Sequence, residues 1–338
     1  MRFIATSQKP TALTVEVLGI FLPVGDHTLQ DAALAFPKNI RDELLKAAQK
    51  ARFQGKPKET FFFYTHSKLP CFLLAFVGIG EANDPKEIMI DSIREAAALL
   101  GQTATKHHAT SVGVCIADCA HASLSSETIG EAIAEGMKLG TYKFAKYKKI
   151  NHEKKEETPI EKCSIITKNQ HELEKGLHSG RLEAEGVILA RNLINEPPGE
   201  MQPKELAQEA EKIAKKAGKA MRCKIFGRDE LKALGCGGIL AVSQGSNSDP
   251  FLIHLTYIPE RKKPTKKIAI VGKGITFDSG GLSLKPADYM DNMKSDMSGA
   301  AAVLGLFSIL HELHPSAEIH GIIPTCENMP SGDAIKPG

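Results

Sequence analysis

The sequence lacks the features that mark a membrane protein, a secreted protein or a zinc ribbon. It has no uninterrupted apolar run of membrane-spanning length, and its first residues, MRFIATSQ, carry neither an apolar core nor a small-residue cleavage site. Its seven cysteines are scattered without a C-x-x-C spacing, and the closest pair is Cys115 and Cys119. We therefore expect a cytoplasmic protein with no membrane partner and with reduced, mostly buried thiols.

An excess of one charge is also missing. Lys and Arg number 43 against 40 Asp and Glu, which leaves a formal net charge of +3 at pH 7. So small an excess does not by itself indicate nucleic acid or an anionic membrane as a partner. What the sequence does have is the composition of a globular protein, with 42% hydrophobic and 25% charged residues, and a length of 338 residues that predicts two domains.

The first part of the chain alternates strand-like and helical patterns. Residues 13–24 form a β-branched, apolar run of strand length, and residues 39–53 are apolar at helical spacing. Further strands are expected at 61–64, 71–77 and 111–117, and further helices at 88–105 and after Ser125 or Ser126, which would cap the second. This alternation predicts an α/β domain with a mixed sheet, which we place at residues 1–160.

Residues 143–157 (KFAKYKKINHEKKEE) are dense in charge and lose the apolar periodicity. Their lysines, interleaved with Phe144 and Tyr147, would suit a nucleic-acid patch. A solvated linker is the alternative, because glutamates within the stretch neutralise much of the charge. We place the domain boundary near 150–170.

Residues 161–338 again mix helices and strands. Helices are expected at 170–194, 203–217 and 229–234, and strands at 223–226, 252–257 and 267–271. We predict a second α/β domain, with a central sheet flanked by helices. Ligands of such sheets gather at the carboxyl ends of strands, which directs attention to the segment that follows residue 271.

That segment reads VGKGITFDSGGLSLKP (271–286) and continues through NMKSDMSG (292–299). It matches neither a Walker loop, nor a dinucleotide fingerprint, nor a nucleophile elbow. It does hold two lysines and two aspartates: Lys273, Asp278, Lys285 and Asp296.

Two carboxylates and an amine at the end of a strand suit divalent metal binding. Asp278 could bridge two cations, and Lys273 could be a ligand if its amine were neutral. Lys285, if kept charged, could hydrogen-bond a developing oxyanion. The alternatives are an ion pair of Lys273 and Asp278 around a tight turn, and a capping role for Asp296 at the start of a helix.

These residues resemble the metal-site block of the leucyl aminopeptidases, the two-metal cytosolic exopeptidases of the M17 type. The similarity covers KGITFDSGGLSLKP (273–286) and MKSDMSGAA (293–301), together with RNLINEP (191–197), GILAVSQGS (238–246) and ENMPSG (327–332). It extends from about Arg191 to the last residue, and more faintly over the amino-terminal domain.

The resemblance implies a role for each residue. Lys273, Asp278 and Asp296 match metal ligands, with Asp278 bridging; Lys285 matches an electrophilic lysine, and Met293 matches a residue that lines the pocket for the substrate's first side chain. It also implies a two-metal aminopeptidase that releases leucine and similar residues from peptides with a free amino terminus. Zinc, manganese or magnesium would occupy the sites, and a homo-hexamer is the implied assembly.

The sequence departs from the family pattern in one respect. The resemblance implies a further segment, Asp-Ala-Glu-Gly-Arg, with two more ligands and a catalytic arginine, and no Asp-x-Glu-Gly-Arg occurs in the 338 residues. We expect the catalytic domain to be incomplete, and the chain to be either a fragment of a longer chain or a truncated product without turnover. A non-catalytic DNA-binding protein and an inactive scaffold are the competing functions.

Overall fold

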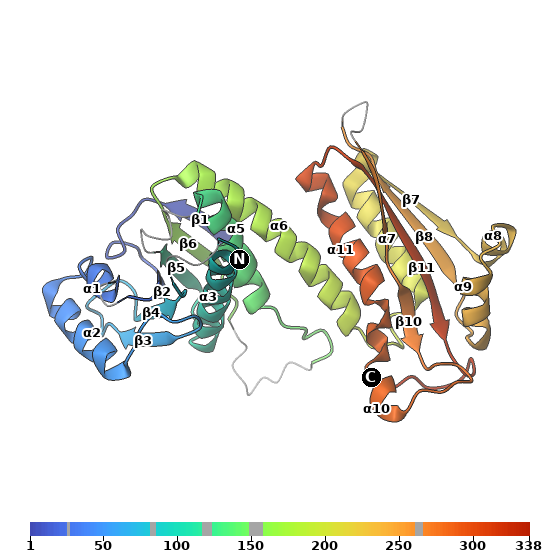
Figure 1. Cartoon of the computed structure of the whole chain (residues 1–338), viewed down its shortest axis with the longest axis horizontal. Coiled ribbons are helices and arrows are strands. Elements are labelled where there is room, and N and C mark those ends of the chain that lie inside the picture. Colours follow the sequence, from blue (N-terminus) through green and yellow to red (C-terminus); the bar gives the residue numbers. More distant parts are fainter. Residues whose placement is uncertain (26–27, 82–85, 117–123, 149–157, 261–265) are drawn as a thin grey trace. The chain divides into compact units, whose positions relative to one another are not determined.

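The computed structural model describes residues 1–25, 28–81, 86–116, 124–148, 158–260 and 266–338 (Figure 1). The chain forms two compact units, Met1–Ala184 and Glu185–Gly338. The division falls within one long helix, α6 (Gln170–Asn195). Of the charged stretch predicted as a linker, residues 149–157 lie outside the described part.

The first unit is built on a six-stranded sheet in the order β1-β6-β5-β2-β4-β3. All neighbouring strands are parallel except β3 and β4. The strands are β1 (Arg2–Thr6), β2 (Val17–Leu22), β3 (Thr60–Tyr64), β4 (Leu73–Gly78), β5 (Ser111–Ile116) and β6 (Lys162–Ile166). The helices before α6 are α1 (Thr28–Ala33), α2 (Lys38–Ala51), α3 (Lys86–Lys106) and α5 (Ser126–Gly140).

Both faces of this sheet are covered. Every residue of β2 and β4 is buried, as expected for central strands of a parallel sheet with helices on both sides. One hydrophobic core includes residues of α3 and α5, and another includes residues of α1 and α2. The predicted cap of α5 is confirmed, since the Ser125 hydroxyl accepts a hydrogen bond from Thr128 N–H at 3.1 Å.

The second unit has a five-stranded mixed sheet in the order β10-β11-β8-β7, in which β9 also pairs with β11. Its strands are β7 (Met221–Phe226), β8 (Phe251–Tyr257), β9 (Lys267–Val271), β10 (Gly274–Asp278) and β11 (Glu318–Asn328). Its helices are α7 (Pro203–Ala217), α8 (Arg228–Ala233), α9 (Gly237–Val242), α10 (Ala287–Met290) and α11 (Ser298–Leu313).

Helices α7 and α11 cover one face of this sheet, and their apolar side chains form a single core with β8 and β11 (Figure 1). The small residues of α11 permit close packing, because a Cβ on Gly305 would lie 2.4 Å from the carbonyl oxygen of Gly186 in α6. The predicted α/β class of both parts is therefore confirmed.

Three cysteines bear out the prediction of buried thiols. Cys71, Cys163 and Cys326 are buried and free, and burial raises the pKa of each thiol, to about 11, 12 and 11 respectively. No helix in the described ranges has both the length and the apolar character needed to cross a bilayer.

Candidate functional site

The strand that carries the candidate site is interrupted once. β9 and β10 pair in succession with the same strand, β11, and Gly272 and Lys273 separate them. At this break the backbone touches the start of α11, where Ala300 N–H donates to the Lys273 carbonyl at 2.9 Å. A Cβ on Gly272 would lie 2.4 Å from the Gly299 carbonyl oxygen. Glycine thus permits the close approach that brings Lys273 beside the chain entering α11.

Asp278 is the last residue of β10, and a bulge sets its direction. Ile275 pairs with Cys326 whereas Asp278 pairs with Asn328, so three steps along β10 match two along β11. Bulges of this kind re-aim side chains and are frequent beside active sites. The sequence predicted one strand here, at 267–271; the structure has a second, β10, which Asp278 ends.

Three donors hold the carboxylate of Asp278. Its Oδ1 atom accepts hydrogen bonds from Asn328 Nδ2 at 2.7 Å and from Gly280 N–H at 3.0 Å, and its Oδ2 atom accepts one from Lys285 Nζ at 2.6 Å. Burial alone would raise the pKa of Asp278, but these hydrogen bonds hold it below its ordinary value. Asp278 is therefore a carboxylate at neutral pH.

A tight turn brings Lys285 back to Asp278. Gly280 and Gly281 adopt positive φ angles of 88° and 67°, and Lys285 N–H then donates to the Ser279 carbonyl at 2.9 Å. The Lys285 Nζ atom also lies 3.0 Å from the sulfur of Met293, the first residue of the 3₁₀ helix η3 (Met293–Met297). Lys285 is thus in direct contact with two other predicted site residues, Asp278 and Met293.

Asp296, on η3, forms an ion pair with Lys273 at 3.0 Å. The Oδ2 atom of Asp296 is buried, and Lys273 Nζ is the cationic group that faces it. Burial raises the pKa of Asp296, the nearby charge of Asp278 adds to the rise, and Lys273 opposes it. The two aspartates therefore differ: the surroundings of Asp278 favour its ionised form, whereas those of Asp296 disfavour it.

The structure brings all five predicted residues into one region, as two Lys–Asp pairs with Met293 beside one of them. Sequence reasoning missed Asn328, which holds Asp278 across 50 residues of the chain. Asn328 belongs to the segment ENMPSG (327–332), which is part of the family resemblance. The motif does not predict which residue its side-chain amide contacts. The register of β10 and β11 was needed to find it.

The donor set fits part of a divalent-metal shell. Carboxylate oxygens suit hard and borderline cations, and the buried Oδ2 atom of Asp296 already faces a cationic group, Lys273 Nζ, at 3.0 Å. Divalent ions take about four to eight donors. Within the described ranges no group of three or more His, Cys, Asp or Glu is arranged to hold a metal. Lys273, Asp278 and Asp296 therefore account for only part of the coordination.

A pocket of about 440 Å³ opens beside these residues. Lys273 and Asp278 contribute to its wall, and most of the remainder is apolar surface of α9 and of the strands, including Ile239 and Val242. Val242 is 39% exposed, so the apolar wall is open to an incoming group. The arrangement places an apolar surface next to charged groups that suit a cation.

Comparison with known proteins identifies two domains of one family. Residues 188–338 match the catalytic domain of the cytosol aminopeptidase family, and residues 17–151 match the N-terminal domain of the same family.

Individual proteins give a consistent result. The chain is 35% identical over 348 residues to a probable cytosol aminopeptidase of Alkaliphilus metalliredigens, a match that covers 100% of this chain and 67% of the relative. It is 38% identical over 300 residues to a probable cytosol aminopeptidase of Aquifex aeolicus, with 89% and 58% covered. The chain thus spans about three fifths to two thirds of the length of these relatives.

Solved structures agree in fold. The K354E mutant of tomato leucine aminopeptidase superposes with a TM-score of 0.80 at 26% identity, over 99% of this chain and 64% of that chain. The bottromycin maturation enzyme BotP in complex with Mn gives a TM-score of 0.75 at 28% identity, over 95% of this chain and 62% of that chain.

Proposed function

The chain belongs to the cytosol aminopeptidase family, and from that premise we propose that the protein is a metal-dependent aminopeptidase that releases residues such as leucine from the amino terminus of peptides. One observation carries the proposal: the Lys273–Asp296 pair at the start of β10 and the Lys285–Asp278 pair at its end both lie beside a largely apolar pocket. The charged groups could hold the metal ions, and the apolar surface could receive the first side chain of a peptide.

Asp278, Asp296 and Lys273 are the proposed metal ligands. Asp278 would be the ligand shared by two ions, because three hydrogen bonds hold it as a carboxylate and carboxylates can bridge divalent cations. Lys273 must lose its proton to coordinate, and neighbouring cations favour that loss. Bound divalent ions would supply Lewis acidity and lower the pKa of the water that attacks the peptide carbonyl.

Lys285 is the proposed electrophilic group. Its ammonium is held by Asp278 at 2.6 Å and touches Met293 at 3.0 Å, so its position is fixed before substrate enters. From there it would donate a hydrogen bond to the carbonyl oxygen as negative charge develops, an interaction that grows stronger in the transition state. Met293 would line the pocket that receives the first side chain of the peptide.

We propose manganese or zinc as the resident ions, with magnesium as a further possibility, and a cytoplasmic homo-hexamer as the working form. The description of BotP as a manganese complex supports the first of these metals. The printed sequence supplies three of the protein ligands that the family resemblance implies. Because the chain covers 67% and 58% of two relatives, the activity is proposed for the whole protein.

The proposal is tested by leucine release from a leucyl amide. The full-length protein should be inactive after removal of metal with a chelator and should regain activity when Mn²⁺ is added back. Absence of leucine release with Mn²⁺, Zn²⁺ and Mg²⁺ in turn would refute the proposed activity. Asp278→Ala serves as the inactive reference in the same assay.

A further inference from the structure

We propose that Asn328 is a positioning residue, whose side-chain amide fixes the orientation in which Asp278 presents its carboxylate to divalent ions. The inference rests on the metal site proposed above and adds to it a residue outside the glycine-rich segment. Its support is a set of contacts made by Glu327 and Asn328, the last two residues of β11, whose side chains point to opposite faces of the sheet.

The first contact is with Asp278 itself. Its Oδ1 atom accepts from Asn328 Nδ2 at 2.7 Å and from Gly280 N–H at 3.0 Å. A carboxylate oxygen has about two acceptor directions, so these two donors fill Oδ1. Rotation of the carboxylate would break both bonds, and the plane of the group is therefore fixed. On Oδ2 the structure shows one side-chain donor, Lys285 Nζ at 2.6 Å, which leaves that oxygen the better placed for a cation.

The second set of contacts fixes Asn328. Its carbonyl oxygen accepts from both the N–H of Ser279, at 2.9 Å, and the Ser279 hydroxyl, at 2.7 Å. The Oδ1 end of its amide packs against the turn, because a Cβ on Gly281 would lie only 2.9 Å from it. The Nδ2 end points to Asp278, and the carboxylate selects this orientation of the amide because only the NH₂ end can donate a hydrogen bond to it.

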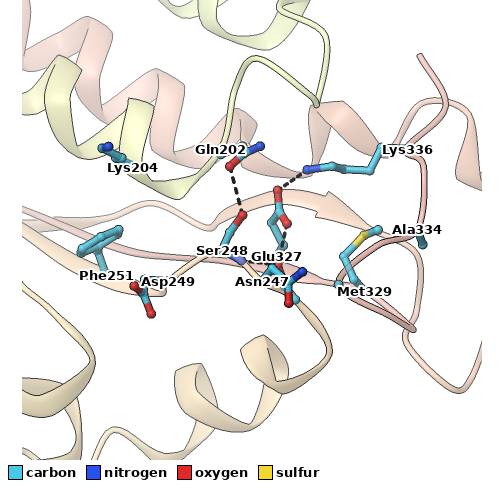
Figure 2. A pocket seen from close by; sticks show the side chains of 12 residues that line it. Gln202, Lys204, Asn247, Ser248, Asp249, Phe251, Glu327, Met329, Ala334 and Lys336 are labelled. Carbon is cyan, nitrogen blue, oxygen red and sulfur yellow. Dashed lines mark hydrogen bonds and ion pairs between the residues drawn. The ribbon is translucent and has the colours of Figure 1, made fainter.

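The third set lies on the other face of the strand, where successive side chains point in opposite directions. Glu327 is 2% exposed; its Oε2 atom accepts from the Ser246 hydroxyl at 2.7 Å and its Oε1 atom accepts from Lys336 Nζ at 2.5 Å. Figure 2 shows Lys336 reaching Glu327 in a pocket of about 420 Å³, next to the hydrogen bond between Ser248 and Gln202. Because Glu327 is held on this face, the backbone that carries Asn328 is anchored as well.

Such a contact bears on metal affinity more than on folding. Groups that hydrogen-bond a ligating carboxylate orient it, and their loss typically weakens metal binding about 10- to 100-fold. A purely structural amide would instead contribute to stability alone. The two roles therefore give different results when the donor is removed.

The test uses the full-length protein and Mn²⁺ alone, with unbound Mn²⁺ followed by electron paramagnetic resonance. We expect Asn328→Ala to raise the dissociation constant for Mn²⁺ about 10- to 100-fold while the unfolding midpoint of the metal-free protein stays near that of the native protein. Raising the Mn²⁺ concentration should then restore leucine release. Asn247→Ala is the matched control, since Asn247 is also in the second unit and its amide contacts the exposed Asp333 at 3.3 Å.

Asn328→Leu keeps the branched shape without a donor and should weaken Mn²⁺ binding in the same way, which keeps the test decisive if the alanine variant folds poorly. Native affinity for Mn²⁺ in both variants would overturn the inference while leaving the metal site intact. If the native protein itself bound no Mn²⁺, the metal-site proposal would fail, and the role of Asn328 with it.

Discussion

The side-chain amide of Asn328 donates a hydrogen bond of 2.7 Å to Asp278 Oδ1 across 50 residues of sequence. Each residue is the last of its strand, and the two strands are parallel neighbours. The candidate metal site therefore depends on strand pairing as well as on the glycine-rich segment that contains most of its charged residues.

Replacing Lys285 by alanine should separate catalysis from metal binding. If Lys285 stabilises the developing oxyanion, kcat should fall about 10²- to 10³-fold, whereas metal content should be retained. Steady-state kinetics and elemental analysis of the same preparation measure both quantities. Lys266→Ala is a control at an exposed lysine. Loss of metal together with activity would assign Lys285 to the metal shell instead.

Gly272→Ala should destabilise the second unit. The added Cβ would lie 2.4 Å from the Gly299 carbonyl, so β9 and the start of α11 must move apart. Overpacking of this kind costs about 1 to 3 kcal/mol, which urea unfolding can measure. At Gly237 no atom lies within 4 Å of an added Cβ, and Gly237→Ala should be neutral or slightly stabilising. Equal effects at the two positions would argue against a steric cause.

Lys336→Met should lower the free energy of unfolding by about 3 kcal/mol. The side chain of Glu327 is 3% exposed and that of Lys336 is 13% exposed, so removal of the lysine leaves a buried carboxylate without its countercharge. The pair of Lys232 and Asp229 is exposed, and Lys232→Met should cost less than about 1 kcal/mol. Similar losses in the two variants, by urea unfolding, would contradict this account.

Glu16 should make the stability of the first unit depend on pH. The hydroxyl of Thr110, with further donors from Thr110 and Ser111, lowers the pKa of Glu16 below its ordinary value of 4.5. A lowered folded-state pKa adds stability above the unfolded-state value, and this stability is lost as pH falls through the folded-state pKa. The stability difference between native protein and Glu16→Gln should therefore be present at pH 7 and shrink below about pH 4.5. A pH-independent difference would contradict it.

The sequence predicted the regular elements of both units well where a pattern was strong. Helix α7 begins with a proline and keeps apolar residues on one face, and it was expected at 203–217, where it lies. The strands β10 and β11 were not expected, because β10 begins with a glycine within a glycine-rich segment and β11 contains Gly321 and Pro324. Their pairing with each other, rather than local propensity, makes them strands.

The candidate site shows the same limit. Spacing and family resemblance were enough to select Lys273, Asp278, Lys285, Met293 and Asp296, and the structure brings them together. The contact with Asn328 arises from a bulge and from a register between segments far apart in sequence. No local pattern encodes such a register, so this residue could be found only in three dimensions.

The most direct test of the metal site is the metal content of Asp278→Ala. The full-length native protein and the variant would be loaded with Mn²⁺ and freed of excess metal. Their bound manganese would then be measured by inductively coupled plasma mass spectrometry. Asp249→Ala is the control, because Asp249 forms an exposed ion pair with Arg228 and lies outside the proposed shell. The account predicts that the native protein and the control retain Mn²⁺ and that Asp278→Ala does not; equal retention in all three would contradict it.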